Sequence, residues 1–226
     1  MFKKFKIIEK INLTPDVFEI HYKSSEQFKI KAGQFITFIL PKIWWRAYSV
    51  LEQKWDKTIL IIKKVKKENW WRWGSIFLCD AEIWDEFNWV WPAGHFVLKK
   101  EDNNKLFIWT WTGLVPLYNQ VLTWLERWDK SEYTLLFWIR KEEDIFYKEN
   151  FEKLSQKYSN FKYEVYLSRE ELENTNKWYV TDYLTKNNLE KINETYICWA
   201  PAMVDSAINI LKENWIKEEN IYFEKY

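Results

Sequence analysis

Hydrophobic and polar residues alternate in short runs along the first part of the chain. Alternation at every second position is typical of β-strands, because it places one face of the strand against a core. Five runs have this pattern: Lys3–Ile11, Val17–Tyr22, Gln34–Leu40, Thr58–Val65 and His95–Leu98. Turn-like clusters separate them, so we expect a small antiparallel β-barrel over residues 1–99.

From residue 104 the pattern changes, and short apolar runs alternate with segments of helical periodicity. The expected strands are Lys105–Ile108, Tyr133–Phe137, Lys162–Leu167, Thr195–Cys198 and Asn220–Phe223, and the expected helices are Pro116–Arg127, Phe146–Tyr158, Val180–Asn187 and Pro201–Asn214. Such alternation predicts a parallel sheet with helices on both faces. The expected fold is therefore an antiparallel β-barrel, residues 1–99, and a Rossmann-like α/β domain, residues 104–226, joined by the polar linker Lys99–Asn104.

Charge and composition exclude several classes of function. The net charge is +1, with lysines and glutamates interspersed, so no nucleic-acid partner is expected. No apolar stretch reaches the roughly 18 residues of a membrane-spanning helix, and Met1–Lys6 lacks the apolar core of a signal peptide; we expect a cytoplasmic protein without membrane insertion. Two cysteines and two distant histidines favour neither an iron–sulfur cluster nor a zinc site, so no metal is expected.

Tryptophan and glycine occur in unusual proportions, with 17 tryptophans and four glycines. The tryptophans cluster between hydrophobic runs, as in residues 70–73 and 109–111, where loops that favour glycine belong. Some bacterial lineages read the UGA codon as glycine, and a translation that writes tryptophan for UGA would give this sequence. We therefore interpret these tryptophans as glycine positions. The alternative is a Trp-rich, non-enzymatic binding module that stacks glycans or bases on its indoles.

Arg46-Ala47-Tyr48-Ser49 is the first segment with candidate chemistry. Alternate residues of an extended segment face opposite sides, so these side chains can divide their tasks. Arg46 can fork onto a pyrophosphate, Tyr48 can stack on a flat heterocycle and Ser49 can hydrogen-bond a ring nitrogen. Taken alone, the segment also fits an ordinary exposed strand.

Residues 70–75 form the second segment, which ends in Trp73-Gly74-Ser75. With glycine at its tryptophans it becomes a flexible loop that opens onto a helix with a serine near its first turn. Exposed amides and the helix dipole at such a turn suit a phosphate group. A plain surface loop is the alternative.

The third segment runs from a predicted strand into a predicted helix and would read Gly-Thr-Gly-Thr-Gly with two tryptophans replaced by glycine. Its residues are Trp109, Thr110, Trp111, Thr112, Gly113 and, in the helix, Pro116. This is the layout of a dinucleotide pyrophosphate site, although the spacing differs from G-x-G-x-x-G. A structural strand–helix turn is the alternative.

Cys198-Trp199-Ala200-Pro201-Ala202-Met203 is the fourth segment, and it follows another predicted strand. Ligands of open α/β sheets bind outside the carboxyl ends of the strands, where Cys198 could touch a substrate ring. Buried cysteines are nevertheless more often inert.

Together these segments resemble the ferredoxin–NADP⁺ reductase family of flavoproteins over essentially the whole chain. That family carries an Arg-x-Tyr-Ser flavin motif, a Gly/Ser phosphate loop, a Gly-Pro-x-Gly-x-Phe segment, a Gly-Thr-Gly-x-x-Pro nucleotide loop, an aromatic-Gly-x-Arg segment, a Cys-Gly-x-Pro-x-Met segment and often an aromatic last residue. The corresponding residues are Arg46/Tyr48/Ser49, Trp73/Ser75, Trp91/Pro92/Gly94/Phe96, Trp111/Thr112/Gly113/Pro116, Phe137/Trp138/Arg140, Cys198/Trp199/Pro201/Met203 and Tyr226. Every family glycine in them falls on a tryptophan or on a genuine glycine. Val50 departs from the Ser or Thr that usually follows the flavin motif, and Arg72 departs from the glycine of the phosphate loop.

The resemblance implies that the first domain binds FAD, that the second binds NAD(P)H, and that hydride passes from nicotinamide to the flavin N5. It implies that Arg46 neutralises the FAD pyrophosphate while Tyr48 stacks on the isoalloxazine. The catalytic candidates are Ser49 at the flavin N5, Cys198 at the nicotinamide and Glu224 as a proton relay. Tyr226 would cover the flavin face.

The resemblance also bears on the nucleotide and the acceptor. Ser168-Arg169 is similar to the NADP-type Ser-Arg pair of plant-type relatives, and Lys177 and Tyr179 lie where such relatives place adenosine contacts, so NADP is expected over NAD. The expected acceptor is a small electron carrier such as ferredoxin or flavodoxin. The alternative is a reductase component of an oxygenase or of another flavin electron-transfer system.

Overall fold

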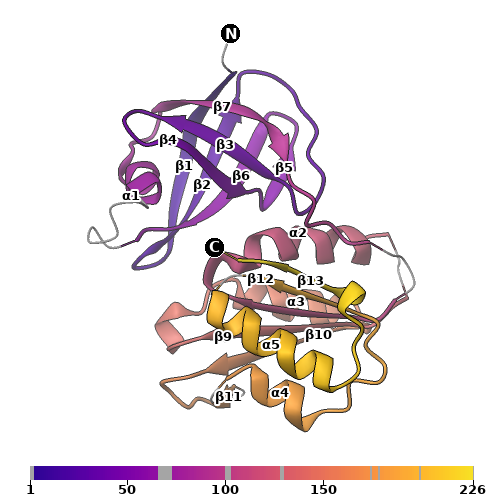
Figure 1. Cartoon of the computed structure of the whole chain (residues 1–226). Helices are drawn as coiled ribbons and strands as arrows, with labels where there is room; N and C mark the ends of the chain where they lie inside the picture. The colour runs from indigo at the N-terminus through magenta and orange to yellow at the C-terminus, as the bar shows by residue number, and fades with distance from the viewer. Residues whose placement is uncertain are drawn as a thin grey trace. The chain divides into compact units, whose positions relative to one another are not determined.

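The computed structural model describes residues 3–65, 73–99, 103–127, 130–173, 175–177, 179–198 and 200–225 (Figure 1). The chain divides into two units, Met1–Leu98 with Tyr118–Gln120, and Lys99–Leu117 with Val121–Tyr226. Residues 100–102 of the expected linker and residues 70–72, 199 and 226 of the candidate segments lie outside the described residues.

Seven antiparallel strands form the sheet of the first unit, in the order β4-β3-β7-β1-β2-β6-β5. They are β1 (Lys3–Thr14), β2 (Val17–Ser24), β3 (Phe35–Leu40), β4 (Trp44–Ser49), β5 (Glu52–Lys54), β6 (Lys57–Lys63) and β7 (Glu86–Ala93), with the helix α1 (Trp73–Asp80) before β7. The sheet curls around one core (Figure 1), in which Phe5 stacks on Trp89 with ring centroids 4.5 Å apart.

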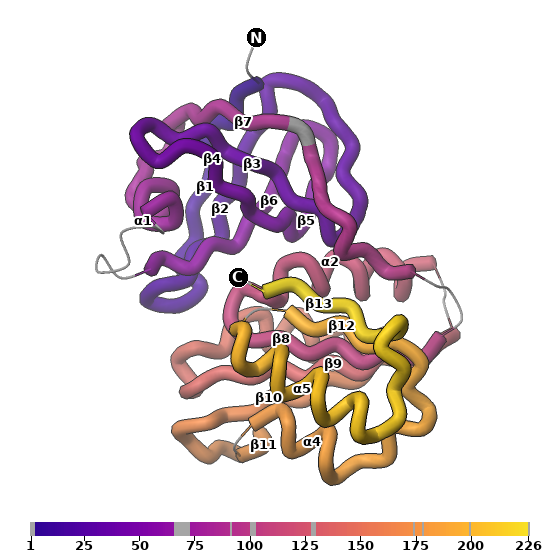
Figure 2. Tube along the Cα trace, in the orientation of Figure 1, coloured from indigo at the N-terminus to yellow at the C-terminus, as the bar shows by residue number. Residues whose placement is uncertain are grey.

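Six parallel strands form the sheet of the second unit, in the order β11-β10-β9-β8-β12-β13 (Figure 2). The strands are β8 (Lys105–Thr110), β9 (Tyr133–Ile139), β10 (Phe161–Leu167), β11 (Asn176–Lys177), β12 (Glu194–Cys198) and β13 (Ile221–Glu224). The helices are α2 (Leu114–Leu125), α3 (Lys148–Lys157), α4 (Thr181–Lys186) and α5 (Pro201–Glu213).

Alternation along β8 explains why helices cover both faces of this sheet. Leu106 and Ile108 point into one core with α4 and α5. Trp109 points to the opposite face, where its ring lies 5.5 Å from that of Phe151 in α3. The strand is therefore buried on both sides, as its continuous apolar sequence predicts.

The predicted fold class is confirmed, namely an antiparallel sheet followed by a parallel α/β unit. Two predictions about elements are wrong. Residues 95–98 are not a strand, because β7 ends at Ala93 and Gly94 turns the chain with a φ of +113°. Several tryptophans assigned to loops lie in strands instead: Trp44, Trp45, Trp89, Trp91 and Trp109.

Two findings concern what the described residues lack. None of their helices is both long enough and apolar enough to cross a membrane. They contain no group of three or more histidine, cysteine or acidic side chains arranged to hold a metal ion.

Candidate functional site

The β3–β4 ladder positions the first candidate segment. Arg46 lies opposite Phe38 and Tyr48 opposite Ile36, so both side chains belong to one face of the sheet. The Tyr48 ring meets the edge of Phe38 at 5.9 Å, and burial raises the pKa of its hydroxyl well above the usual value. Ser49 is the neighbour of Phe35 on the opposite face. Tyr48 is thus a neutral aromatic surface anchored to the core.

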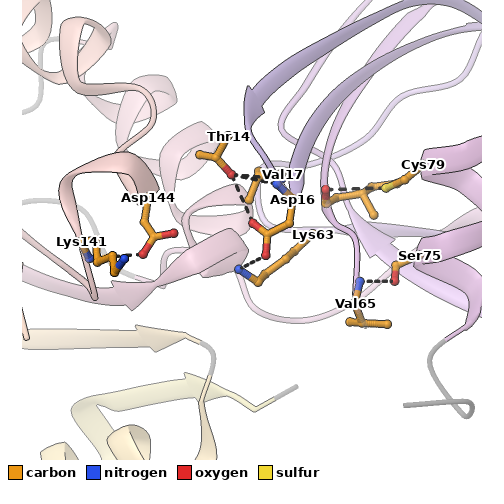
Figure 3. Close-up of polar contacts among 10 residues, drawn as sticks. Thr14, Asp16, Val17, Lys63, Val65, Ser75, Cys79, Lys141 and Asp144 are labelled. Atoms are coloured by element: carbon orange, nitrogen blue, oxygen red, sulfur yellow. Dashed lines mark hydrogen bonds and ion pairs between the residues drawn. The ribbon is translucent and has the colours of Figure 1, made fainter. Parts of the chain in front are cut away.

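The first turn of α1 lies against Arg46 and Tyr48. A Cβ at Gly74 would stand 2.6 Å from the Arg46 Cγ and 3.0 Å from the Tyr48 hydroxyl, so only glycine permits this approach. The Ser75 hydroxyl is buried and accepts a hydrogen bond from the Val65 amide at 3.3 Å (Figure 3). The aliphatic part of the Arg46 side chain therefore packs on the first turn of α1, and its guanidinium donates to the Trp45 carbonyl at 2.8 Å. An arginine beside the amide end of a helix is a combination that suits an anion.

Beside α1 lies a hollow of about 700 Å³. Apolar side chains line most of it: Ile43, Trp73, Ile76, Phe77 and Phe87. Of the acidic side chains at its edge, Glu86 is paired with Lys4 at 2.8 Å and Asp80 with Lys64. The hollow therefore suits an apolar group rather than a cation.

In the second unit, three candidate residues form a row at the carboxyl ends of adjacent strands. Cys198, the last residue of β12, lies between Trp109 of β8 and Glu224 of β13. Burial raises the pKa of the Cys198 thiol well above its usual value, and the nearby Glu224 carboxylate raises it further. Cys198 is therefore a neutral thiol at physiological pH, suited to lining a site rather than to nucleophilic attack.

The sheet order places a topological switch point at this edge. The chain runs from β8 outward through β9, β10 and β11, and then returns to β12 on the other side of β8. In doubly wound sheets, ligands bind where the strand order reverses. The switch point lies between β8 and β12, where the third and fourth candidate segments begin.

Trp109 and Trp111 of the third candidate segment lie in different surroundings. Trp109 is completely buried, because strand alternation directs it into the core beneath α3. Trp111 follows the strand, with a φ of +51°, and its ring lies 5.8 Å from the Arg140 guanidinium. Only the indole of Trp111 occupies the loop.

The rest of the third candidate segment is closely packed. Thr110 and Thr112 are buried, and the Thr110 hydroxyl has no hydrogen-bond partner among the described residues. Gly113 precedes α2, in which Pro116 is the third residue and is buried. Met203 is also buried, in the core between α5 and the sheet, so it supports the fourth segment from within.

The residues expected at the adenosine end lie at the sheet edge formed by β10 and β11. Ser168 and Arg169 follow β10, and their amides donate to the carbonyls of Ile139 and Arg140 at 3.0 Å. Lys177 ends β11, and the exposed ring of Tyr179 lies 5.3 Å from that of Trp138.

Sequence reasoning missed one residue at this edge. The Glu171 carboxylate lies 2.7 Å from the Lys177 ammonium. The acidic run Glu170-Glu171 directly after Arg169 was the available signal.

Positive backbone φ angles occur mostly at tryptophans. Seven non-glycine residues of the described chain have positive φ angles between 51° and 82°, and five of them are tryptophans. These are Trp44, Trp55, Trp84, Trp111 and Trp215; the others are Lys42 and Tyr147. L-residues disfavour this region and glycine does not, so these five corners have glycine geometry.

Comparisons with known proteins show what the chain is similar to. Residues 107–208 match the family model of the oxidoreductase NAD-binding domain. The chain is 30% identical to a component of the Na(+)-translocating NADH-quinone reductase of Actinobacillus pleuropneumoniae, over 60% of this chain and 35% of that protein. It is 27% identical to the phenol hydroxylase P5 protein of Acinetobacter pittii, over 97% of this chain and 64% of that protein. The chain thus spans only about a third of the first of these relatives.

Solved structures agree on the fold. The cytochrome P450 reductase of Amycolatopsis superposes with a TM-score of 0.87 at 20% identity, over 100% of this chain and 69% of that one. A ferredoxin NADP⁺ reductase from Neisseria gonorrhoeae, solved with bound FAD and NADP, gives a TM-score of 0.85 at 16% identity, over 100% and 99%. Residues 107–208 are thus similar to an oxidoreductase NAD-binding domain, and the whole chain shares the two-domain fold of these solved structures.

Proposed function

We propose that this protein is a flavin-dependent NAD(P)H oxidoreductase. The observation that carries the proposal is the pair of anion-binding arrangements, one in each unit. Arg46 meets the first turn of α1 in the antiparallel unit, and the Thr110–Gly113 loop leads into α2 at the switch point of the parallel unit. FAD and a nicotinamide dinucleotide each carry a pyrophosphate that such an arrangement suits.

The residues of the first unit fit FAD. Arg46 and the amides of the first turn of α1 would hold the pyrophosphate. Because a side chain at position 74 would collide with Arg46 and Tyr48, Gly74 would contact the phosphate through its backbone alone. Tyr48 would support the isoalloxazine ring, since it is neutral and anchored by Phe38. Ser49 would hydrogen-bond the ring system. When bound, the flavin supplies the redox chemistry, and these side chains supply orientation and charge.

The residues of the second unit fit a nicotinamide dinucleotide if position 111 is small. The buried Thr110 hydroxyl lacks a partner in the described chain and is available to a ligand phosphate. The indole of Trp111 stands over Arg140, a cation that would otherwise face the pyrophosphate. Cys198 would line the nicotinamide position as a neutral thiol, and Glu224 beside it would hold or release a proton.

We also propose that the cell inserts glycine at the tryptophan positions with glycine geometry. Four of the five positive-φ tryptophans are strongly exposed, so their indoles contribute little packing: Trp44, Trp55, Trp84 and Trp215. Inside the fold, the indole N–H groups of Trp109 and Trp138 are buried without a hydrogen-bond partner in the described chain. An unpaired buried donor costs about 1–3 kcal/mol, which glycine would avoid. A Trp-rich binding module would gain nothing from either arrangement.

The proposed acceptor is a small electron carrier such as ferredoxin or flavodoxin. One observation favours a second candidate, an oxygenase component, because the match to the phenol hydroxylase P5 protein covers 97% of this chain. For the nucleotide we propose NADP, on the strength of the Ser168-Arg169 pair at the end of β10. Comparing turnover with NADPH and NADH tests that choice, and a large NADH preference would refute it.

Two measurements test the proposal. Protein purified from its native source should carry a yellow flavin and should oxidise NAD(P)H in the presence of an artificial acceptor. Its intact mass should be lower than the printed sequence requires, because glycine replaces tryptophan. A colourless protein of the full tryptophan mass would refute both the reductase and the glycine proposals.

A further inference from the structure

The carboxyl ends of β10 and β11 bring an acidic and a basic side chain together at the edge of the second sheet. Lys177 pairs with Leu167 in the parallel ladder, so it lies beside the residue that precedes Ser168 and Arg169. Its ammonium is 2.7 Å from the Glu171 carboxylate, and 49% of the lysine side chain and 69% of the glutamate side chain are exposed. Lys177, which lies beside this end of β10, is thus already paired with a carboxylate.

The surrounding loops are acidic rather than basic. Residues 140–144 and 168–177 contain four cationic side chains against six acidic ones. Several of the acidic groups have fixed roles. Glu170 accepts the amide hydrogen of Glu142 at 2.8 Å, and Asp144 accepts that of Lys141 at 3.2 Å. A dianionic phosphate that arrives here meets Arg169 as a cation with no ion pair among the described residues, and it must compete with Glu171 for Lys177.

From this arrangement we infer that Glu171 is a specificity-determining residue, which weakens binding of a 2′-phosphorylated adenosine by holding Lys177. The inference rests on the proposed function, because it assumes that the adenosine half of a dinucleotide binds at this edge. A ribose 2′-hydroxyl is neutral and needs no ion pair with Lys177. A 2′-phosphate, in contrast, needs that cation and is repelled by the Glu171 carboxylate. Glu171 therefore acts on NADPH and leaves NADH nearly unaffected.

The expected size follows from the exposure of the pair. Exposed ion pairs contribute at most about 1 kcal/mol, which the phosphate must overcome to recruit Lys177. Removing the carboxylate charge should therefore favour the 2′-phosphorylated ligand by about fivefold, since 1.4 kcal/mol corresponds to tenfold.

The experiment measures binding, not turnover. The full chain carrying Trp111→Gly is titrated calorimetrically with AMP and with adenosine 2′,5′-bisphosphate. Glu171→Gln should raise the affinity ratio of bisphosphate to AMP about fivefold. Glu173→Gln is the matched control, because it removes one charge from the same exposed loop without touching Lys177, and the ratio should change less than twofold. In a Lys177→Met background, Glu171→Gln should have no effect.

Each alternative outcome is decisive. If neither probe binds to any variant, both the proposed nucleotide site and this inference are wrong. If both probes bind and Glu171→Gln leaves the ratio unchanged, the nucleotide site stands and the inference is overturned. An equal rise in the two glutamine variants would also overturn it, because the effect would then come from the overall charge of the loop.

Discussion

Replacing Trp55 by glycine should stabilise the first unit, although it removes a large side chain. Trp55 and Asp56 form the two-residue loop of the β5–β6 hairpin, in which Lys54 pairs with Lys57. Trp55 has a φ of +55°, and Asp56 is not among the positive-φ residues. This is the pattern of a type II′ turn, whose first central position favours glycine.

The magnitude follows from three contributions. A left-handed conformation costs an L-residue roughly 1–2 kcal/mol, which glycine removes. Glycine loses more conformational entropy on folding, which subtracts about 0.5–1 kcal/mol. The side chain of Trp55 is 83% exposed, so little burial is lost. The net gain should be about 0.5–1 kcal/mol in the free energy of unfolding.

The assay is urea unfolding of the whole chain, with Trp45→Gly as the matched control. Trp45 is also exposed, at 56%, but it lies inside β4 without a positive φ. Glycine in a strand interior should therefore lower the stability by about 0.5–1 kcal/mol. The two substitutions remove the same side chain and should have opposite signs. If Trp55→Gly lowered the unfolding midpoint as much as Trp45→Gly, the reasoning from backbone geometry would be refuted.

Three further predictions concern the sites and the pH dependence. Trp111→Gly should raise the affinity for NADP⁺ at least about tenfold by freeing the loop and Arg140; calorimetry checks this, and an unchanged affinity would contradict it. Arg46→Ala should weaken FAD binding about tenfold or more, with Arg46→Lys in between, as measured by flavin content, because a charged hydrogen bond contributes roughly 1.5–3 kcal/mol; equal flavin content in all three proteins would argue against the anion site. Burial raises the pKa of the Cys79 thiol from 9.0 to about 12, so the unfolded chain loses this proton first and stability should fall as the pH rises from 9 toward 12. Cys79→Ala should flatten that slope in urea titrations, and an unaltered slope would assign it to other groups.

The architecture of the second unit could be predicted closely because each of its strands is an uninterrupted apolar run. The predicted helix Pro201–Asn214 differs from α5 by one residue at its carboxyl end. The first unit was harder to predict, since its β7 contains Trp89 and Trp91 and reads as a loop once tryptophan is taken to indicate a turn. Two-residue β11 lacks any periodicity, because its pairing depends on β10 and not on its own residues.

Strand register explains which site residues lie next to one another better than the sequence motifs do. The adjacency of Cys198 and Glu224 follows only from the β12–β13 ladder, and no spacing in the sequence indicates it. The opposite behaviour of Trp109 and Trp111 likewise depends on where β8 ends. The Glu171–Lys177 pair was hidden because five residues lie between the two in sequence, whereas the chain turns back after β10 and pairs Lys177 with Leu167.

The five left-handed tryptophan corners have a consequence for how this protein can be produced. At roughly 1–2 kcal/mol each, together they would cost about 5–10 kcal/mol, which is comparable to the entire stability of an ordinary domain. A chain with tryptophan at these corners would therefore be barely stable. Under the proposal that UGA encodes glycine, a common laboratory host would also stop at each UGA codon of the unchanged gene and give truncated chains. Respelling those codons as ordinary glycine triplets should restore soluble yield, without any change to the fold itself.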